Sequence, residues 1–76
     1  MDHLKYIITD RKGWAVFNNL QTHKEIAEKL YGTPISAGFI RFGTKMNIEC
    51  WGESVSLKLK SKEQEDADFL KEHIYK

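Results

Sequence analysis

The strand-like segments of this chain carry large apolar residues in both alternation phases. Successive side chains of a β-strand point to opposite faces of the sheet, so a sheet covered on one side normally shows apolar residues in one phase only. In the first segment, Tyr6 and Ile8 share one phase while Ile7 falls in the other. The same doubling recurs at residues 14–17 and 35–42. The chain therefore holds more apolar side chains than one face of a small sheet needs.

The length predicts a single small globular domain over residues 1–76. A domain of this size buries only about 60–65% of the surface that its unfolded chain exposes. Its stability therefore depends on good packing or on a second subunit that covers more surface.

Charge and cysteine content narrow the functional classes. The net charge of +1 is too balanced for a typical strong nucleic-acid binder. The only cysteine, Cys50, cannot form a disulfide within the chain, which favours a reducing, cytoplasmic location. The apolar stretches are far shorter than the ~20 residues that span a bilayer, so we expect no membrane partner.

The first half of the chain predicts a β-hairpin followed by a helix. The segments 4–9 and 14–17 are rich in β-branched and aromatic residues and flank a turn at 10–13. Thr22 and Glu25 form a capping box, which predicts a helix over about 23–31. Gly32 suits the left-handed position that closes such a helix.

The second half predicts three strands and a helix. The strands are expected at 35–42, 46–51 and 55–60, the last with Val55 among its buried residues. Ser61 and Gln64 repeat the capping-box spacing before the final helix, whose first turns are acidic.

The order ββαβββα predicts an α+β fold. Short connections between strands favour a mainly antiparallel sheet of about five strands. With both helices on one face of that sheet, the domain would be a two-layer sandwich.

Two resemblances lead to no family. The segment from Glu25 to Leu30, with Ser36 and Ala37, resembles the first half of a helix-turn-helix, but residues 34–40 favour a strand over the second helix. The order αβββα resembles a double-stranded-RNA-binding domain. That family has basic residues at the start of its second helix, whereas this chain has Glu63, Glu65, Asp66 and Asp68 there.

Candidate catalytic and metal sites all have plainer explanations. Cys50 shares a phase with Ile48 and is expected in the core, where a thiol is inert. The histidines His3, His23 and His73 lack metal-ligand spacing and are expected in surface or capping roles. The carboxylates of 63–68 are expected to be solvated at the start of a helix. We therefore expect no enzyme, no cofactor and no metal site.

The excess of apolar residues favours a non-enzymatic interaction module or accessory protein, of the kind found in microbes or phages. The partner would be a second copy, forming a homodimer or larger homo-oligomer, or another protein. One aromatic-rich sheet face would carry the contact. Its candidate residues are Trp14, Phe39, Phe42 and Trp51.

The alternative is nucleic-acid binding through a basic strand surface, with Trp51 or Phe39 as a stacking platform. Its candidate residues are Arg41, Lys45, Lys58 and Lys60. The same lysines would equally protect an edge strand from aggregation.

Overall fold

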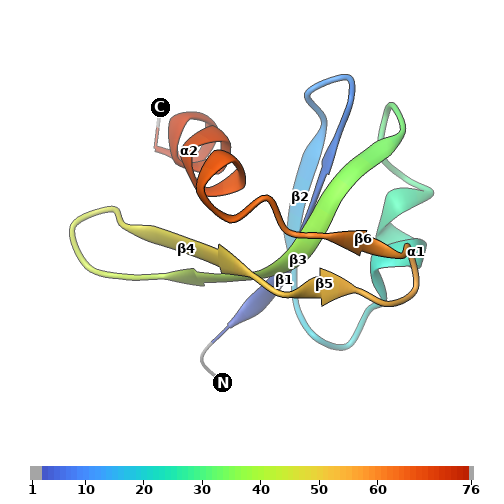
Figure 1. Cartoon of the computed structure of the whole chain (residues 1–76), viewed down its shortest axis with the longest axis horizontal. Helices are drawn as coiled ribbons and strands as arrows, with labels where there is room; N and C mark the ends of the chain where they lie inside the picture. The colour runs from blue at the N-terminus through green and yellow to red at the C-terminus, as the bar shows by residue number, and fades with distance from the viewer. Residues whose placement is uncertain (1–2, 76) are drawn as a thin grey trace.

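The computed structural model describes residues 3–75 and contains six strands and two helices in that range. In chain order they are β1 (Leu4–Thr9), β2 (Trp14–Phe17), α1 (His23–Ala27), β3 (Pro34–Phe42), β4 (Ile48–Trp51), β5 (Glu53–Ser54), β6 (Leu59–Lys60) and α2 (Glu63–Ile74). The first four strands form an antiparallel sheet in the order β2-β1-β3-β4, and β5 and β6 form a small hairpin (Figure 1). The α+β class and the antiparallel sheet are confirmed.

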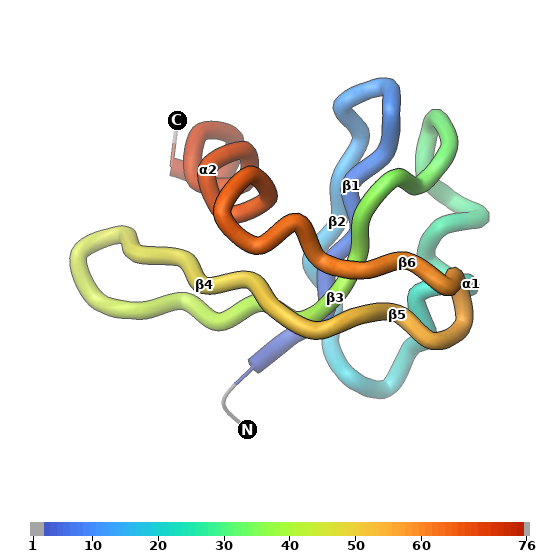
Figure 2. The backbone as a smooth tube through the Cα atoms, viewed as in Figure 1, coloured from blue at the N-terminus to red at the C-terminus, as the bar shows by residue number. Residues whose placement is uncertain are grey.

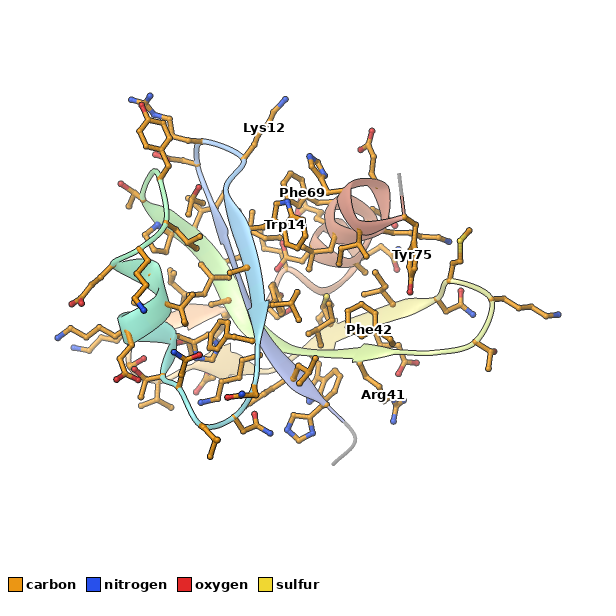
Figure 3. The ribbon with its side chains drawn as sticks, turned by 180° about the vertical axis from the view of Figure 1, so that it is seen from behind. Lys12, Trp14, Arg41, Phe42, Phe69 and Tyr75 are labelled. Carbon is orange, nitrogen blue, oxygen red and sulfur yellow. The ribbon has the colours of Figure 1, made fainter. Side chains whose placement is uncertain are left out.

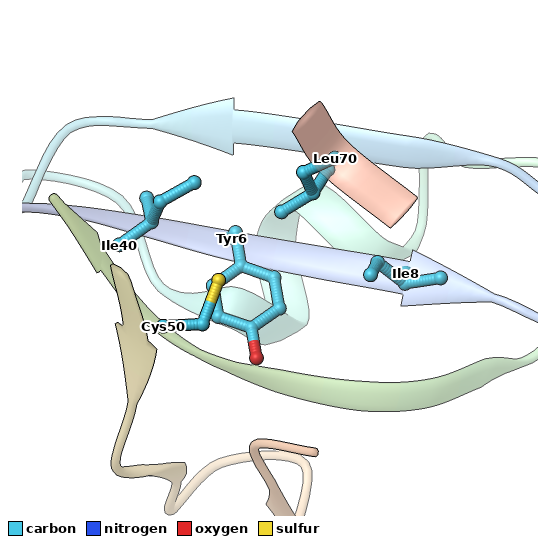
Figure 4. Close-up of a cluster of buried hydrophobic side chains, with 5 residues drawn as sticks. All are labelled: Tyr6, Ile8, Ile40, Cys50 and Leu70. Atoms are coloured by element: carbon cyan, nitrogen blue, oxygen red, sulfur yellow. The ribbon is translucent and has the colours of Figure 1, made fainter. Parts of the chain in front are cut away.

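Helix α2 covers one face of the sheet. Strands β1 and β3 contribute Tyr6, Ile8 and Ile40 to a cluster that Cys50 of β4 and Leu70 of α2 complete (Figure 4). All five side chains are buried, so the core position expected for Cys50 is confirmed.

The opposite face has its own core. Ile7 lies between Tyr6 and Ile8 and therefore points the other way, toward Phe17 and Ala37. Side chains of α1 and of the β5–β6 hairpin pack against this second cluster. They are Ile26 and Ala27 of α1, Leu30 just beyond it, and Leu57 and Leu59.

The two helices thus lie on opposite faces, and the expectation of both on one face is wrong (Figures 1 and 2). The domain has three layers: α2, the sheet, and α1 with the small hairpin. Apolar residues in both phases of β1 are satisfied within one chain, because each phase has its own cover.

Helix α1 begins as predicted and ends early. The Thr22 hydroxyl accepts from the Glu25 N–H at 3.1 Å, and the Glu25 carboxylate accepts from the Thr22 N–H at 2.8 Å, so the capping box is confirmed. The α-helix stops at Ala27, and the last turn tightens to i→i+3 bonds such as Leu30 N–H to Ala27 O. Gly32 has φ +99°, the left-handed conformation expected there.

The strand expected at 55–60 is a tight hairpin instead. The Lys58 N–H donates to the Val55 carbonyl at 3.3 Å, and Lys58 itself adopts φ +57°. The turn leaves Val55 81% exposed, so its expected burial is wrong, while Leu57 and Leu59 still reach the α1-side core. Two leucines spaced two residues apart can reach the same core from a tight turn and the strand after it, as well as from one continuous strand.

Helix α2 lacks the predicted Ser61–Gln64 capping box. Its N-cap residue is Lys62, whose side chain makes no capping bond, and the Lys62 N–H donates to the Asp66 carboxylate at 2.9 Å. Ser61 is used elsewhere, in a 2.6 Å hydrogen bond with the Tyr6 hydroxyl. Within residues 3–75, neither helix combines the length and the apolar composition that crossing a membrane takes.

The two-sided core predicts that Ile7→Ala lowers the free energy of unfolding by about 2–5 kcal/mol, because it opens a cavity at a fully buried site. Ile35→Ala is the matched control: Ile35 is 41% exposed, and its truncation should cost less than about 1 kcal/mol. Urea denaturation of the three proteins measures both values. Equal, small losses would show that the face carrying Ile7 has no core.

Candidate functional site

The four aromatic residues expected on one sheet face are divided between the two faces. Phe42 shares the phase of Ile40 and Trp14 lies opposite Ile8, so both belong to the α2 side (Figure 3). Phe39 and Trp51 lie directly opposite each other in β3 and β4 on the other side. The structure therefore brings together two of the four residues and separates the remaining two from them.

Phe39 and Trp51 form an aromatic patch with His3, which precedes β1. The His3 ring lies edge-on to Phe39 at 5.1 Å and to Trp51 at 5.7 Å between ring centroids. Phe39 and Trp51 are 6.2 Å apart. All three residues are half-buried, so the aromatic patch of His3, Phe39 and Trp51 is partly exposed. The contribution of His3 is absent from the expectations based on sequence.

Gly52 makes room for the patch. It adopts φ +81°, and a Cβ built on it would lie 2.7 Å from Cδ2 of Phe39. Both the left-handed backbone and the missing side chain are needed at this position. Glycine at the end of β4 therefore fixes where the Phe39 ring can lie.

One ion pair borders the patch. Arg41 Nε donates to Glu49 Oε1 at 3.0 Å across the β3–β4 ladder, and a second nitrogen of the guanidinium contacts the same oxygen. The guanidinium carbon lies 6.0 Å from the centroid of Trp51, within cation–π range. Both charged side chains are about half exposed, so the pair adds little to stability but presents planar, hydrogen-bonding groups beside the rings.

His23 lies beneath the patch, and the expected surface or capping role is wrong. Its side chain is buried, and Nε2 lies 3.0 Å from the carbonyl oxygen of Gly38. The ring makes edge contacts with Phe17 at 5.5 Å and Phe39 at 6.3 Å. Burial lowers the pKa of His23, because the protonated ring loses solvation there.

The basic residues of the alternative hypothesis lie on two separate hairpins. Arg41 and Lys45 belong to the β3–β4 hairpin, whereas Lys58 and Lys60 belong to the β5–β6 hairpin. The turns of these hairpins lie at opposite ends of the long axis (Figure 1). Arg41 borders the aromatic patch and forms an ion pair with Glu49.

Asp66 is buried, although the sequence suggested a solvated helix start. Its carboxylate accepts hydrogen bonds from the Tyr6 hydroxyl, from Ser36 Oγ at 3.0 Å and from the Lys62 N–H. Burial, and next the bond to the carboxylate, raise the pKa of Tyr6, so that the hydroxyl stays a donor. The sequence does carry a signal, since Asp66 lies four residues before Leu70 and so on the same helix face.

The same buried region holds Cys50. Burial raises the pKa of its thiol to about 12, which leaves it protonated at neutral pH. Tyr6, Ser36, Asp66 and Cys50 are each at least 94% buried. The hydrogen bonds of Asp66 with Tyr6 and Ser36, and the packing of Cys50 near Leu70, hold α2 against the sheet.

The described residues, 3–75, contain no group of three or more histidine, cysteine, aspartate or glutamate side chains placed to hold a metal ion. Comparison of the chain with protein-family models, curated proteins and solved structures finds no match.

The buried imidazole predicts a pH-dependent stability. Because its folded pKa lies below the unfolded value of about 6.5, the unfolded chain takes up the proton first as pH falls. Stability should thus be full above pH ~6.5 and decrease as the pH drops toward the folded pKa. His23→Gln, which keeps a donor for the Gly38 carbonyl, should flatten this decrease in urea denaturation between about pH 7.5 and 5.5.

His3→Gln is the control for this measurement, since His3 is part of the patch and not of the core. It should keep the pH dependence of the original chain. An unchanged slope in His23→Gln would contradict the assignment.

Proposed function

We propose that this chain is a small protein-binding module whose contact surface is the aromatic patch of His3, Phe39 and Trp51. The observation that carries the proposal is the mutual contact of three half-buried rings on a sheet surface. Ile7 and Tyr6 are fully buried and belong to the core, whereas the three residues of the patch remain partly exposed.

The residue types in and beside the patch suit a protein partner. Aromatic side chains bury a large area with few rotatable bonds, so they lose little entropy on binding. Tryptophan and arginine dominate the energetics of protein interfaces, and here Arg41 lies beside Trp51. Because Arg41 is already aligned by Glu49, its remaining donors are held in place for a partner.

The patch replaces the larger surface expected from the sequence. Trp14 packs against the α2-side core and is left out of the proposed contact. Phe42 is 40% exposed, but it lies on the opposite face from Trp51 and cannot share one flat contact with it. The module binds a second copy or another protein through the three rings.

Trp51→Thr should strongly weaken partner binding while keeping the β-propensity of β4. The tagged original chain is expected to form a homo-oligomer in sedimentation or to retain a partner protein in stoichiometric amount. Loss of a central tryptophan should weaken that complex by more than about 30-fold, equivalent to about 2 kcal/mol. Val55→Ser is the control, since it removes a highly exposed apolar side chain of the β5–β6 turn, outside the patch, and should leave binding unchanged.

Two results would overturn the proposal. One is a chain that sediments as a monomer at high concentration and retains no partner. The other is equal retention by the original chain and by Trp51→Thr.

Nucleic-acid binding is expected to be absent. The four basic candidates are divided between two hairpins whose turns lie at opposite ends of the molecule, which disfavours a single basic patch along a phosphate backbone. Fluorescence anisotropy of a labelled single-stranded oligonucleotide at low salt should show no saturable binding. Binding that falls steeply with added salt would instead favour the basic-surface hypothesis.

A further inference from the structure

Strand β4 has an unpaired edge. It is the last strand of the sheet, with β3 on one side only. The Gly43 N–H donates to the Asn47 carbonyl, and hydrogen-bonded pairs alternate along an antiparallel ladder. The pairs Arg41–Glu49 and Phe39–Trp51 therefore exchange hydrogen bonds, and the N–H and C=O groups of Ile48 and Cys50 point away from β3.

A hollow follows this edge. It has a volume of about 520 Å³, and its lining includes Ile48 and Cys50 from one face of β4 and Glu49 and Trp51 from the other. Residues of both faces can line one hollow only where it runs along the edge of the strand. Helix α2 supplies the facing wall, including Glu63, and a second hollow of about 600 Å³ continues toward the β3–β4 turn.

We propose that an extended segment of a partner protein binds in this hollow as an additional antiparallel strand on β4. This inference rests on the proposed function, because Trp51 belongs to both the aromatic patch and the hollow. Main-chain hydrogen bonds to Ile48 and Cys50 would supply affinity, and pockets for alternate side chains would supply specificity. One set of side chains would face the patch, and the other would face α2.

The occupant is an extended segment and not a second copy. Two copies could pair their β4 edges antiparallel across a two-fold axis perpendicular to the sheet. Corresponding faces of the two sheets would then lie on the same side, so the two α2 helices would face each other across the β4–β4 junction. Residues of α2 line the hollow along this edge, so an incoming β4 would bring its own α2 against the helix that already lies there.

Charge indicates the side chains of that segment. Arg41 and Glu49 pair with each other, which leaves Glu63 as the uncompensated charge around the first hollow. A strand whose α2-facing side chains are basic and whose patch-facing side chains are apolar would match it.

The test uses a capped heptapeptide that alternates lysine and valine, beginning and ending with lysine. NMR titration should show saturable shifts and slowed amide exchange at Ile48 and Cys50. Directly opposite residues in a sheet share a face, so the lysines that face Glu63 are also the residues whose N–H groups point at β4. N-methylation of the lysines should weaken binding by more than about tenfold, whereas N-methylation of the valines should change it by less than about threefold.

Glu63→Gln should weaken peptide binding about two- to fivefold, the scale of a partly exposed ion pair. Glu65→Gln is its matched control, being a neighbouring glutamate of α2 outside the hollow, and should leave binding unchanged.

Three results would overturn the inference: no change at Ile48 and Cys50 with the peptide in large excess, equal binding of both methylated peptides, or protection of these amides by self-association without peptide. If Trp51→Thr still releases the natural partner, the proposed function survives such a failure. If the peptide binds as described but Trp51→Thr retains the partner, the proposed function fails instead.

Discussion

Burial of β1 on both faces is the constraint around which this small domain is built. Tyr6 and Ile7 are adjacent, point in opposite directions and are both fully buried. A sheet with apolar side chains on both faces needs a cover on each side. Each Å² of apolar surface that the cover removes from water stabilises the fold by roughly 25 cal/mol. With 76 residues, the chain uses α2 for one face and α1 with the β5–β6 hairpin for the other. The part of the sheet carrying Phe39 and Trp51 keeps its rings half-buried.

The Asp66 carboxylate determines where the larger cover lies. A buried charge is costly unless donors surround it, and here Tyr6, Ser36 and the Lys62 backbone all donate to it. Those donors come from β1, β3 and the residue before α2, so only one placement of the helix satisfies all of them. Apolar packing of Leu70 and its neighbours on α2 is non-directional and constrains the position of the helix less. The polar network therefore also sets the distance between α2 and the free edge of β4.

Alternation and turn residues were sufficient to predict the strands at 4–9, 14–17 and 35–42, the start of α1 and the burial of Cys50. They were insufficient to assign the helices to faces, because apolar residues in both phases fit a partner as well as a second internal cover. The prediction of a continuous strand from Val55 was wrong for a related reason, because a tight hairpin is compatible with the same alternation of apolar and polar residues. Local pattern specifies which residues are apolar, and tertiary packing decides what covers them.

The candidate site depends on register, which is why sequence alone could not define it. Phe39 and Trp51 are neighbours only because the register of β3 and β4 places them directly opposite each other. A slip of this register by one residue would move one of the two rings to the α2 side of the sheet. His3 joins them because β1 runs antiparallel beside β3 and begins at Leu4, which lies opposite Ile40. The same register turns the backbone groups of Ile48 and Cys50 toward the open edge. One pairing thus produces both the aromatic surface and the unpaired strand beside it, so that a single extended partner could contact both.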